Sequence, residues 1–144
     1  MENEILYYTL SADNAPRLLG ADIFDNPVQQ AQLDAFVADP GHILVFATDK
    51  TRVIGMASGV VMLHPDKQPM FFINEVGVNE DMRKQGIGGK LSQRLMELAR
   101  ARGCKGIWLA TEPDNVEARA LYRKLDARET EGIVVYDWDG AMDD

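Results

Sequence analysis

The chain has 144 residues, a single cysteine and a formal net charge of −8 at pH 7. This length is enough for one domain with a buried core, which we expect over residues 1–144. Cys104 has no partner for an internal disulfide, so we expect a reduced, cytoplasmic setting. The acidic charge argues against a nucleic-acid partner, and the lack of any run of 18 uncharged apolar residues argues against a membrane span.

The first half of the chain predicts three strands and two helices. Ser11 is a suitable N-cap for the first helix, and Asn26 followed by Pro27 is typical of the start of a second. Two β-branched apolar runs joined by a short polar turn predict a hairpin. In chain order we expect a strand over 4–10, a helix over 14–24, a helix from 26 to about 39–41, and strands over 42–48 and 53–63.

The second half predicts a strand, helix, strand crossover, then a helix and a closing strand. Apolar residues recur at helical spacing from Leu91 to Ala99, and Gly103 supplies a left-handed stop. Asp114 with Glu117 three residues later is typical of an acidic capping box. The expected elements are a strand over 70–78, a helix over 88–102, a strand over 105–111, a helix over 114–125 and a strand over 128–138. Together these elements predict a mixed α/β sheet with helices on both faces.

A glycine-rich turn, RKQGIGGK from Arg83 to Lys90, connects the strand over 70–78 to the following helix. Such a turn leaves backbone N–H groups unpaired at the positive end of a helix dipole, which is a binding site for phosphate. A nucleotide P-loop is excluded because Leu91 follows Gly89-Lys90 where Ser or Thr is required. The dinucleotide fingerprint fails as well, because Leu91 stands at its third glycine. We therefore expect a phosphate-bearing cofactor of another kind.

Arg83, Gly86 and Gly88, placed after a Val-x-Val strand end, resemble the acetyl-CoA loop of the GCN5-related N-acetyltransferase (GNAT) superfamily. A second family motif, Asn-x-x-Ala-x-x-Leu-Tyr-x-Lys, is matched from Asn115 to Lys124. The resemblance implies the GNAT fold, an α/β (α+β) fold with a mixed central sheet of six to seven strands, splayed at the acetyl-CoA site and flanked by about four helices. It also implies acetyl-CoA as acetyl donor and a homodimer. Among branches, the chain most resembles the small aminoglycoside 3-N-acetyltransferases and their unassigned relatives.

The resemblance assigns cofactor-binding residues to three places. On the splayed strand, the amides of Val76, Gly77 and Val78 bind the pantetheine arm and the thioester, with a bulge expected near Gly77. In the loop, the residues that wrap the pyrophosphate are Arg83, Lys84, Gln85, Gly86, Ile87, Gly88, Gly89 and Lys90. On the following helix, the matching residues are Asn115, Ala118 and Tyr122.

Two side chains are candidate catalytic groups. Glu75 lies in an apolar run, where a carboxylate is costly to bury unless it is paired or functional. Partial burial raises a carboxyl pKa, as a base for an ammonium requires. The resemblance makes Tyr122 the acid, whose phenol protonates the departing thiolate. The alternatives are a strand-end Glu paired with an arginine and a core aromatic on the helix.

Carboxylates on predicted loops and helix ends favour a small cationic amine as acceptor, such as an aminoglycoside. The candidate substrate residues are Asp22, Asp25 and Glu112, which would steer a cation electrostatically. Each carboxylate is also compatible with a solvated surface position. Two other functions stay open, a peptide or protein N-acetyltransferase and a non-catalytic acyl-CoA-binding module. We predict no metal site. The family's usual glycine after the last helix is Asp126 here, a residue that tolerates the left-handed conformation.

Overall fold

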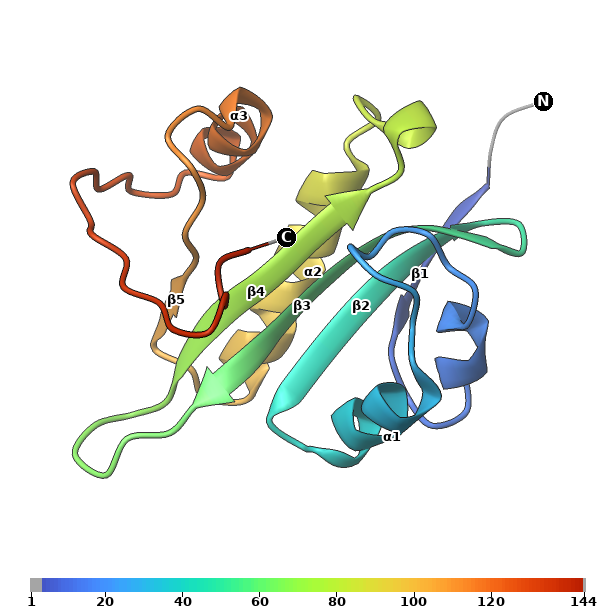
Figure 1. Ribbon diagram of the computed structural model, residues 1–144, viewed down its shortest axis with the longest axis horizontal. Helices are drawn as coiled ribbons and strands as arrows, with labels where there is room; N and C mark the ends of the chain where they lie inside the picture. The colour runs from blue at the N-terminus through green and yellow to red at the C-terminus, as the bar shows by residue number, and fades with distance from the viewer. Residues whose placement is uncertain (1–3, 144) are drawn as a thin grey trace. The chain divides into compact units, whose positions relative to one another are not determined.

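The computed structural model describes residues 4–143 and divides into two compact units, residues 1–109 and 110–144, which are described in turn. The first unit contains a five-stranded sheet in the order β1-β2-β3-β4-β5 (Figure 1). The pairs β1–β2, β2–β3 and β3–β4 are antiparallel, and β4–β5 is parallel. The strands are β1 Ile5–Thr9, β2 His42–Asp49, β3 Arg52–Met62, β4 Met70–Val78 and β5 Gly106–Trp108. The predicted mixed α/β fold is confirmed, and the prediction of one domain over the whole chain stays a prediction.

The helices of the first unit lie on both faces of the sheet, with α1 on one side and α2 on the other (Figure 1). The helical elements are η1 Ala15–Leu18, α1 Gln30–Ala38, η2 Glu80–Met82 and α2 Ile87–Ala101 in this unit, and α3 Val116–Lys124 in the second. Helix α2 is bounded by two left-handed glycines, Gly86 with φ of 78° and Gly103 with φ of 85°. The predicted stop at Gly103 is confirmed, because glycine adopts this conformation without a Cβ clash.

Two apolar cores form because side chains alternate along the strands. In β2, Val45 belongs to the core under α2 and is fully buried with Leu91 and Leu95 of that helix. Its neighbour Phe46 points to the other face and packs in a second core that includes Leu33 of α1. Each such buried side chain contributes about 1.5–3 kcal/mol of transfer free energy. The unit is therefore a three-layer arrangement held mainly by apolar burial.

Two predicted helices of the first half are shorter than expected. The segment over 14–24 forms only the 3-10 helix η1, because the side chain of Asn14 is occupied outside a helix, donating to the Thr9 carbonyl at 2.9 Å and accepting from the Ser11 amide at 2.8 Å. Gly20, with φ of 82°, then turns the chain away. The second helix begins at Gln30 instead of Pro27. The residues between η1 and α1 stay irregular.

A β-bulge at Asn74 changes which face of β4 each side chain occupies. Ser58 pairs with Glu75 and Gly59 pairs with Ile73, so Asn74 is the extra residue. Before the bulge, Ile73 points into the core under α2, and after it Val76 does so. Glu75 therefore faces the opposite side, whereas a regular strand would have put it on the same face as Ile73. The predicted bulge exists, but it lies at Asn74 rather than near Gly77.

The second unit contains α3 and an irregular C-terminal segment. Helix α3 is capped by Asn115, whose Oδ1 accepts from the Ala118 amide at 3.1 Å, so the predicted capping residue Asp114 is wrong by one position. Asp126, with φ of 64°, forms the predicted left-handed stop. It is supported by hydrogen bonds from the Asp126 amide to the Arg123 carbonyl and from the Ala127 amide to the Tyr122 carbonyl, both at 3.0 Å, as in a Schellman motif.

The predicted closing strand over 128–138 is absent, since this segment has no strand pairing within the described residues. The sheet consequently has five strands rather than six to seven, and three α-helices are present in residues 4–143 rather than about four. No helix among these residues has both the length and the apolar character needed to cross a membrane.

Candidate active site

A cavity of about 810 Å³ opens at the C-terminal end of β4. Its walls come from the irregular segment after η1, from β3, from β4 and from η2, all in the first unit. Five carboxylates and two guanidinium groups line it: Asp22, Asp25, Glu75, Glu80, Asp81, Arg52 and Arg83. The structure thus places Asp22, Asp25 and Glu75 around one cavity, and their roles stay predictions. Glu112 belongs to the second unit and does not line this cavity.

Glu75 is half-buried, and its environment favours the protonated form. Burial raises the pKa of the Glu75 carboxyl above its ordinary value, and the negative charge of Asp25 raises it further. No hydrogen bond or ion pair of the Glu75 side chain is present among residues 4–143. The alternative of a strand-end Glu paired with an arginine therefore has no support in this part of the chain. A carboxylate with a raised pKa is a better proton acceptor near neutral pH.

The two arginines of the cavity are both engaged. Arg52 makes a bidentate ion pair with Asp81, with Nη1–Oδ2 and Nη2–Oδ1 distances of 3.0 and 3.4 Å. Arg83 donates from Nε to the Val78 carbonyl at 3.2 Å and so braces the strand end against the loop that follows. The Arg52–Asp81 pair joins residues 29 apart, so no local sequence pattern indicated it.

The loop between η2 and α2 has the backbone shape of an anion-binding nest. Lys84 has φ of 65° and Gly86 has φ of 78°, so two left-handed residues flank Gln85. Ile87 is 3% exposed and anchors the start of α2 in the core, while residues 83–86 are exposed. Alternating backbone of this kind turns successive N–H groups toward one point.

The amides of residues 84–89 find no hydrogen-bond acceptor within the described part of the chain. The first amide of the helix to be satisfied is that of Lys90, which donates to the Gly86 carbonyl at 3.1 Å. These donors lie at the positive end of the α2 dipole. The loop can therefore bind a phosphate or pyrophosphate group through its main chain.

Lys90 has a different environment from the rest of the loop. Its Nζ lies 5.4 Å from the centroid of the Tyr7 ring, and the guanidinium carbon of Arg94 lies 5.3 Å from the same ring. These are cation–π distances. The Lys90 ammonium therefore packs over β1, and its assignment to the cofactor stays a prediction.

Strands β4 and β5 separate along their length, as the resemblance to the acetyltransferase superfamily implies. Pairing is confined to residues 70–72 of β4 and 106–108 of β5. From Ile73 onward, β4 has no β5 partner in residues 4–143, although it remains paired with β3. The stretch from Val76 to Val78 thus has one edge open for a ligand to approach.

The remaining predicted residues belong to the second unit. Asn115 is occupied at both ends of its carboxamide, because it caps α3 and donates from Nδ2 to Thr111 Oγ1 at 3.2 Å. Tyr122 is half-buried, and burial raises the pKa of its phenol. A phenol with a raised pKa stays protonated at neutral pH, as a proton donor requires. Ala118 lies in the first turn of α3 and contributes its amide to the cap.

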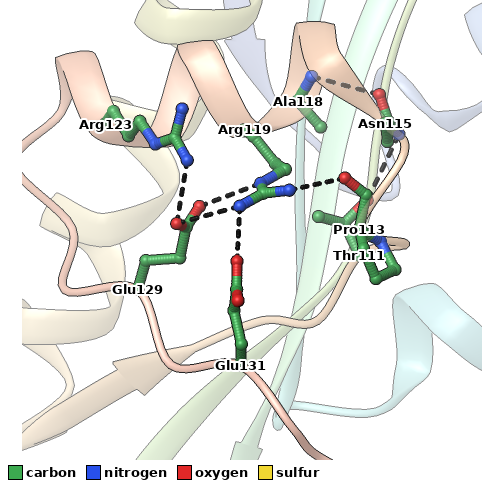
Figure 2. A network of polar contacts seen from close by, with 8 residues as sticks. All are labelled: Thr111, Pro113, Asn115, Ala118, Arg119, Arg123, Glu129 and Glu131. Carbon is green, nitrogen blue, oxygen red and sulfur yellow. Dashed lines mark hydrogen bonds and ion pairs between the residues drawn. The ribbon is translucent and has the colours of Figure 1, made fainter.

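Arginine side chains fasten the C-terminal segment to α3 (Figure 2). Arg119 binds both oxygens of Glu129 at 3.1 Å, Glu131 at 2.7 Å and the Pro113 carbonyl at 2.6 Å. Arg123 adds a bond to Glu129 at 2.9 Å. The Arg119 and Arg123 guanidinium groups lower the pKa of Glu129 to about 2. The second unit is therefore organised by charge, in contrast to the apolar cores of the sheet.

The chain belongs to the acetyltransferase (GNAT) family, whose model matches residues 7–127. The predicted family is thereby confirmed. An L-2,4-diaminobutyric acid acetyltransferase from Shouchella clausii (strain KSM-K16) is 28% identical over 81 residues, covering 56% of this chain and 44% of the relative. An aminoglycoside N(6')-acetyltransferase type 1 from Serratia marcescens is 28% identical over 112 residues, covering 74% and 77%. The N-alpha-acetyltransferase 30 of Schizosaccharomyces pombe (strain 972 / ATCC 24843) is 32% identical over 79 residues, covering 55% and 53%. The match therefore spans less than half the length of the diaminobutyric acid acetyltransferase.

Solved structures share the fold. An aminoglycoside acetyltransferase, meta-AAC0020 from an uncultured soil metagenomic sample, superposes with a TM-score of 0.81 at 16% identity, covering 94% of this chain and 95% of that one. The aminoglycoside acetyltransferase AAC(6')-Iy, solved with a bisubstrate analogue containing CoA, gives a TM-score of 0.80 at 16% identity, covering 94% and 99%. At these identities the likeness concerns the fold.

Proposed function

We propose that this chain is an acetyl-CoA-dependent N-acetyltransferase acting on a primary amine of a small cationic acceptor, such as an aminoglycoside. One observation carries the proposal: a loop with free amides and a cavity lined by carboxylates lie at the same end of β4. The loop suits the pyrophosphate of the donor, and the cavity suits a cationic amine. Membership of the acetyltransferase family connects the two.

The loop suits acetyl-CoA in two respects, its unpaired amide hydrogen-bond donors and its backbone shape. We assign the pyrophosphate to the amides from Lys84 to Gly89, which have no other acceptor in the described residues. We assign the pantetheine arm to the open edge from Val76 to Val78, where β4 has left β5. Acetyl-CoA supplies a thioester whose carbonyl carbon accepts the amine. The phosphate site depends on main-chain shape more than on the charges of Lys84 and Lys90.

Glu75 is the proposed base. An acceptor ammonium loses a proton to the Glu75 carboxylate, directly or through one water, and the nitrogen lone pair then attacks the thioester carbon. The carbon–sulfur bond breaks and the sulfur takes a proton. Tyr122 remains the predicted donor of that proton, on the basis of the family motif that it matches. The raised pKa of Tyr122 supports this assignment, because it keeps the phenol protonated.

The acceptor class follows from charge and from the named relatives. Asp22, Asp25 and Glu75 give the cavity an excess of negative charge once the Arg52–Asp81 pair is set aside. Relatives named for diaminobutyric acid and for aminoglycosides both act on amines that are cationic at neutral pH. A peptide N-terminus is the second candidate, favoured by the 32% identity to N-alpha-acetyltransferase 30. A non-catalytic acyl-CoA-binding module is disfavoured because Glu75 and Tyr122 are both present.

A thiol-release assay with acetyl-CoA tests the proposal across four acceptors: kanamycin, 2,4-diaminobutyric acid, spermidine and a synthetic peptide with a free N-terminus. We expect CoA release with at least one small amine. Turnover of the peptide alone would favour the second candidate, and calorimetric binding of CoA without any turnover would favour the module. The predicted homodimer and cytoplasmic setting are part of the proposal, and light scattering of the purified chain tests the first.

A further inference from the structure

The irregular segment between η1 and α1 packs directly against β4. A Cβ placed on Gly77 would lie only 3.1 Å from the carbonyl oxygen of Ile23 and 3.7 Å from Met56. The backbone of the segment can approach this closely because Gly77 has no side chain. Glu75 lies two residues before Gly77, so the two residues face the same side of the strand. The segment is therefore seated on the face of β4 that presents Glu75.

Asp25 follows Ile23 by two residues and lines the same cavity as Glu75. Its side chain is exposed, and neither carboxylate has a hydrogen bond or ion pair within residues 4–143. Two unpaired carboxylates in one cavity resist simultaneous ionisation. In agreement with this geometry, burial and then the charge of Asp25 are the causes of the raised pKa of Glu75.

The other charged groups of the cavity are placed differently. They are Asp22, Arg52, Glu80, Asp81 and Arg83. The guanidinium of Arg52 is bound by Asp81 and is also influenced by the charge of Asp22. Asp22 and Asp25 are thus two aspartates of the same segment, of which Asp22 acts on Arg52 and Asp25 acts on Glu75. A substitution of Asp22 is therefore a matched control for the same substitution of Asp25.

We propose that Asp25 is a positioning residue for acetyl transfer, facing Glu75 so that the two carboxylates hold the ammonium of the acceptor between them. The proposal rests on the proposed function and extends it to a named residue. When the ammonium N–H bond breaks, the proton goes to a carboxylate oxygen of Glu75 and the electron pair stays on nitrogen. The negative charge of Asp25 favours the protonated form of Glu75 and so strengthens Glu75 as a base.

The decisive experiment is a carbon-13 NMR titration of the full chain labelled at glutamate carboxyl carbons. The Glu75 signal is assigned by its loss in Glu75→Gln. We expect its titration midpoint to move to lower pH in Asp25→Asn and to stay at the wild-type position in Asp22→Asn. An unchanged midpoint in Asp25→Asn, or an equal shift in both variants, would overturn the proposal. Neither acetyl-CoA nor an acceptor is needed for this measurement.

A kinetic experiment tests the same pair in the working enzyme, with the acceptor that wild type acetylates fastest. In Asp25→Asn the acid limb of the kcat/KM profile moves to lower pH, and KM rises by roughly fivefold. In Asp22→Asn the acid limb keeps its position. An acid limb that is unmoved in Asp25→Asn would overturn the role in transfer. Absence of turnover by wild type would refute the proposed function alone, because the NMR titration would still decide how Asp25 acts on Glu75.

Discussion

Strand β4 and the C-terminal segment of the second unit have similar apolar sequences but different structures. Phe71 of β4 is fully buried between strands and helix, whereas Ile133 and Tyr136 of the C-terminal segment are 74% and 79% exposed. Both stretches are rich in β-branched and aromatic residues, so strand propensity does not separate them. The difference is that β4 has neighbours on which to pack, and the C-terminal segment has ion pairs at one end instead. Packing partners decide whether such a sequence becomes a strand.

The largest effect is expected where the sheet is packed most tightly. A Cβ at Gly59 would overlap the ring of Phe71 and the carbonyl oxygen of Phe72. We expect Gly59→Ala to lower the free energy of unfolding by about 3 kcal/mol, because β3 and β4 would have to move apart. Urea denaturation measures the change. The control is Gly132→Ala in the second unit, where no atom lies within 4 Å of the added carbon and only the φ of 86° is strained. Equal losses would show that crowding in the sheet is not the cause.

Tyr122 tests whether the second unit contributes to chemistry. We expect Tyr122→Phe to lower kcat by about a hundredfold, the usual contribution of a proton donor. The Kd for acetyl-CoA should change little, since only the hydroxyl group is removed. Steady-state kinetics and calorimetry measure the two quantities. A parallel loss of kcat and affinity would identify Tyr122 as a packing residue of α3.

Substitutions at the two left-handed glycines that bound α2 distinguish an effect on cofactor binding from an effect on helix stability. Gly86→Val places a β-branched residue at a φ of 78°, and we expect the strained loop to lose roughly tenfold or more in affinity for CoA. Gly103→Val carries similar strain, with φ of 85°, at the other end of the same helix. Calorimetry with CoA should find weakened binding only in the first variant. Unchanged affinity in Gly86→Val would remove the loop from the proposed function.

The smallest effect concerns the pH dependence of the second unit. The Glu129 pKa is lowered to about 2, so its ion pairs stabilise the segment fully above the ordinary carboxyl range. As pH falls from about 4.5 toward 2, the unpaired form gains protons first and this contribution is lost. The NMR backbone chemical shifts over 128–132 should therefore move toward random-coil values in that range. In Glu129→Gln they should lie near random-coil values already at neutral pH, and shifts independent of pH in wild type would contradict the assignment.

Local signals in the sequence were enough to predict most of the first unit. Helix α2 was predictable from the spacing of Leu91 and Leu95 and from Gly103, because each acts within a few residues. The cap at Asn115 was missed by one position, since Asp114 is an equally good capping residue and only the folded turn selects between them. The C-terminal strand was predicted from its β-branched run, which says nothing about a packing partner.

The candidate site shows the same limit. Glu75 and the loop from Arg83 to Lys90 could be found from their sequence context, and Asp22 and Asp25 from their charge. The Arg52–Asp81 pair could not, because it depends on how β3 and η2 meet in three dimensions. The contact of Ile23 with Gly77 was missed for the same reason. Long-range contacts of this kind need the folded chain.

The extra residue at Asn74 decides on which face of β4 the Glu75 side chain lies. If Asn74 took a regular place in the ladder instead of forming the bulge, the Glu75 carboxylate would turn toward the core under α2 and Val76 would take its place on the cavity side, although every amino acid of the proposed machinery would still be present. The face that Glu75 occupies therefore depends on the position of the bulge as well as on the residues present. A sequence comparison that scored only residue identity would not detect this dependence.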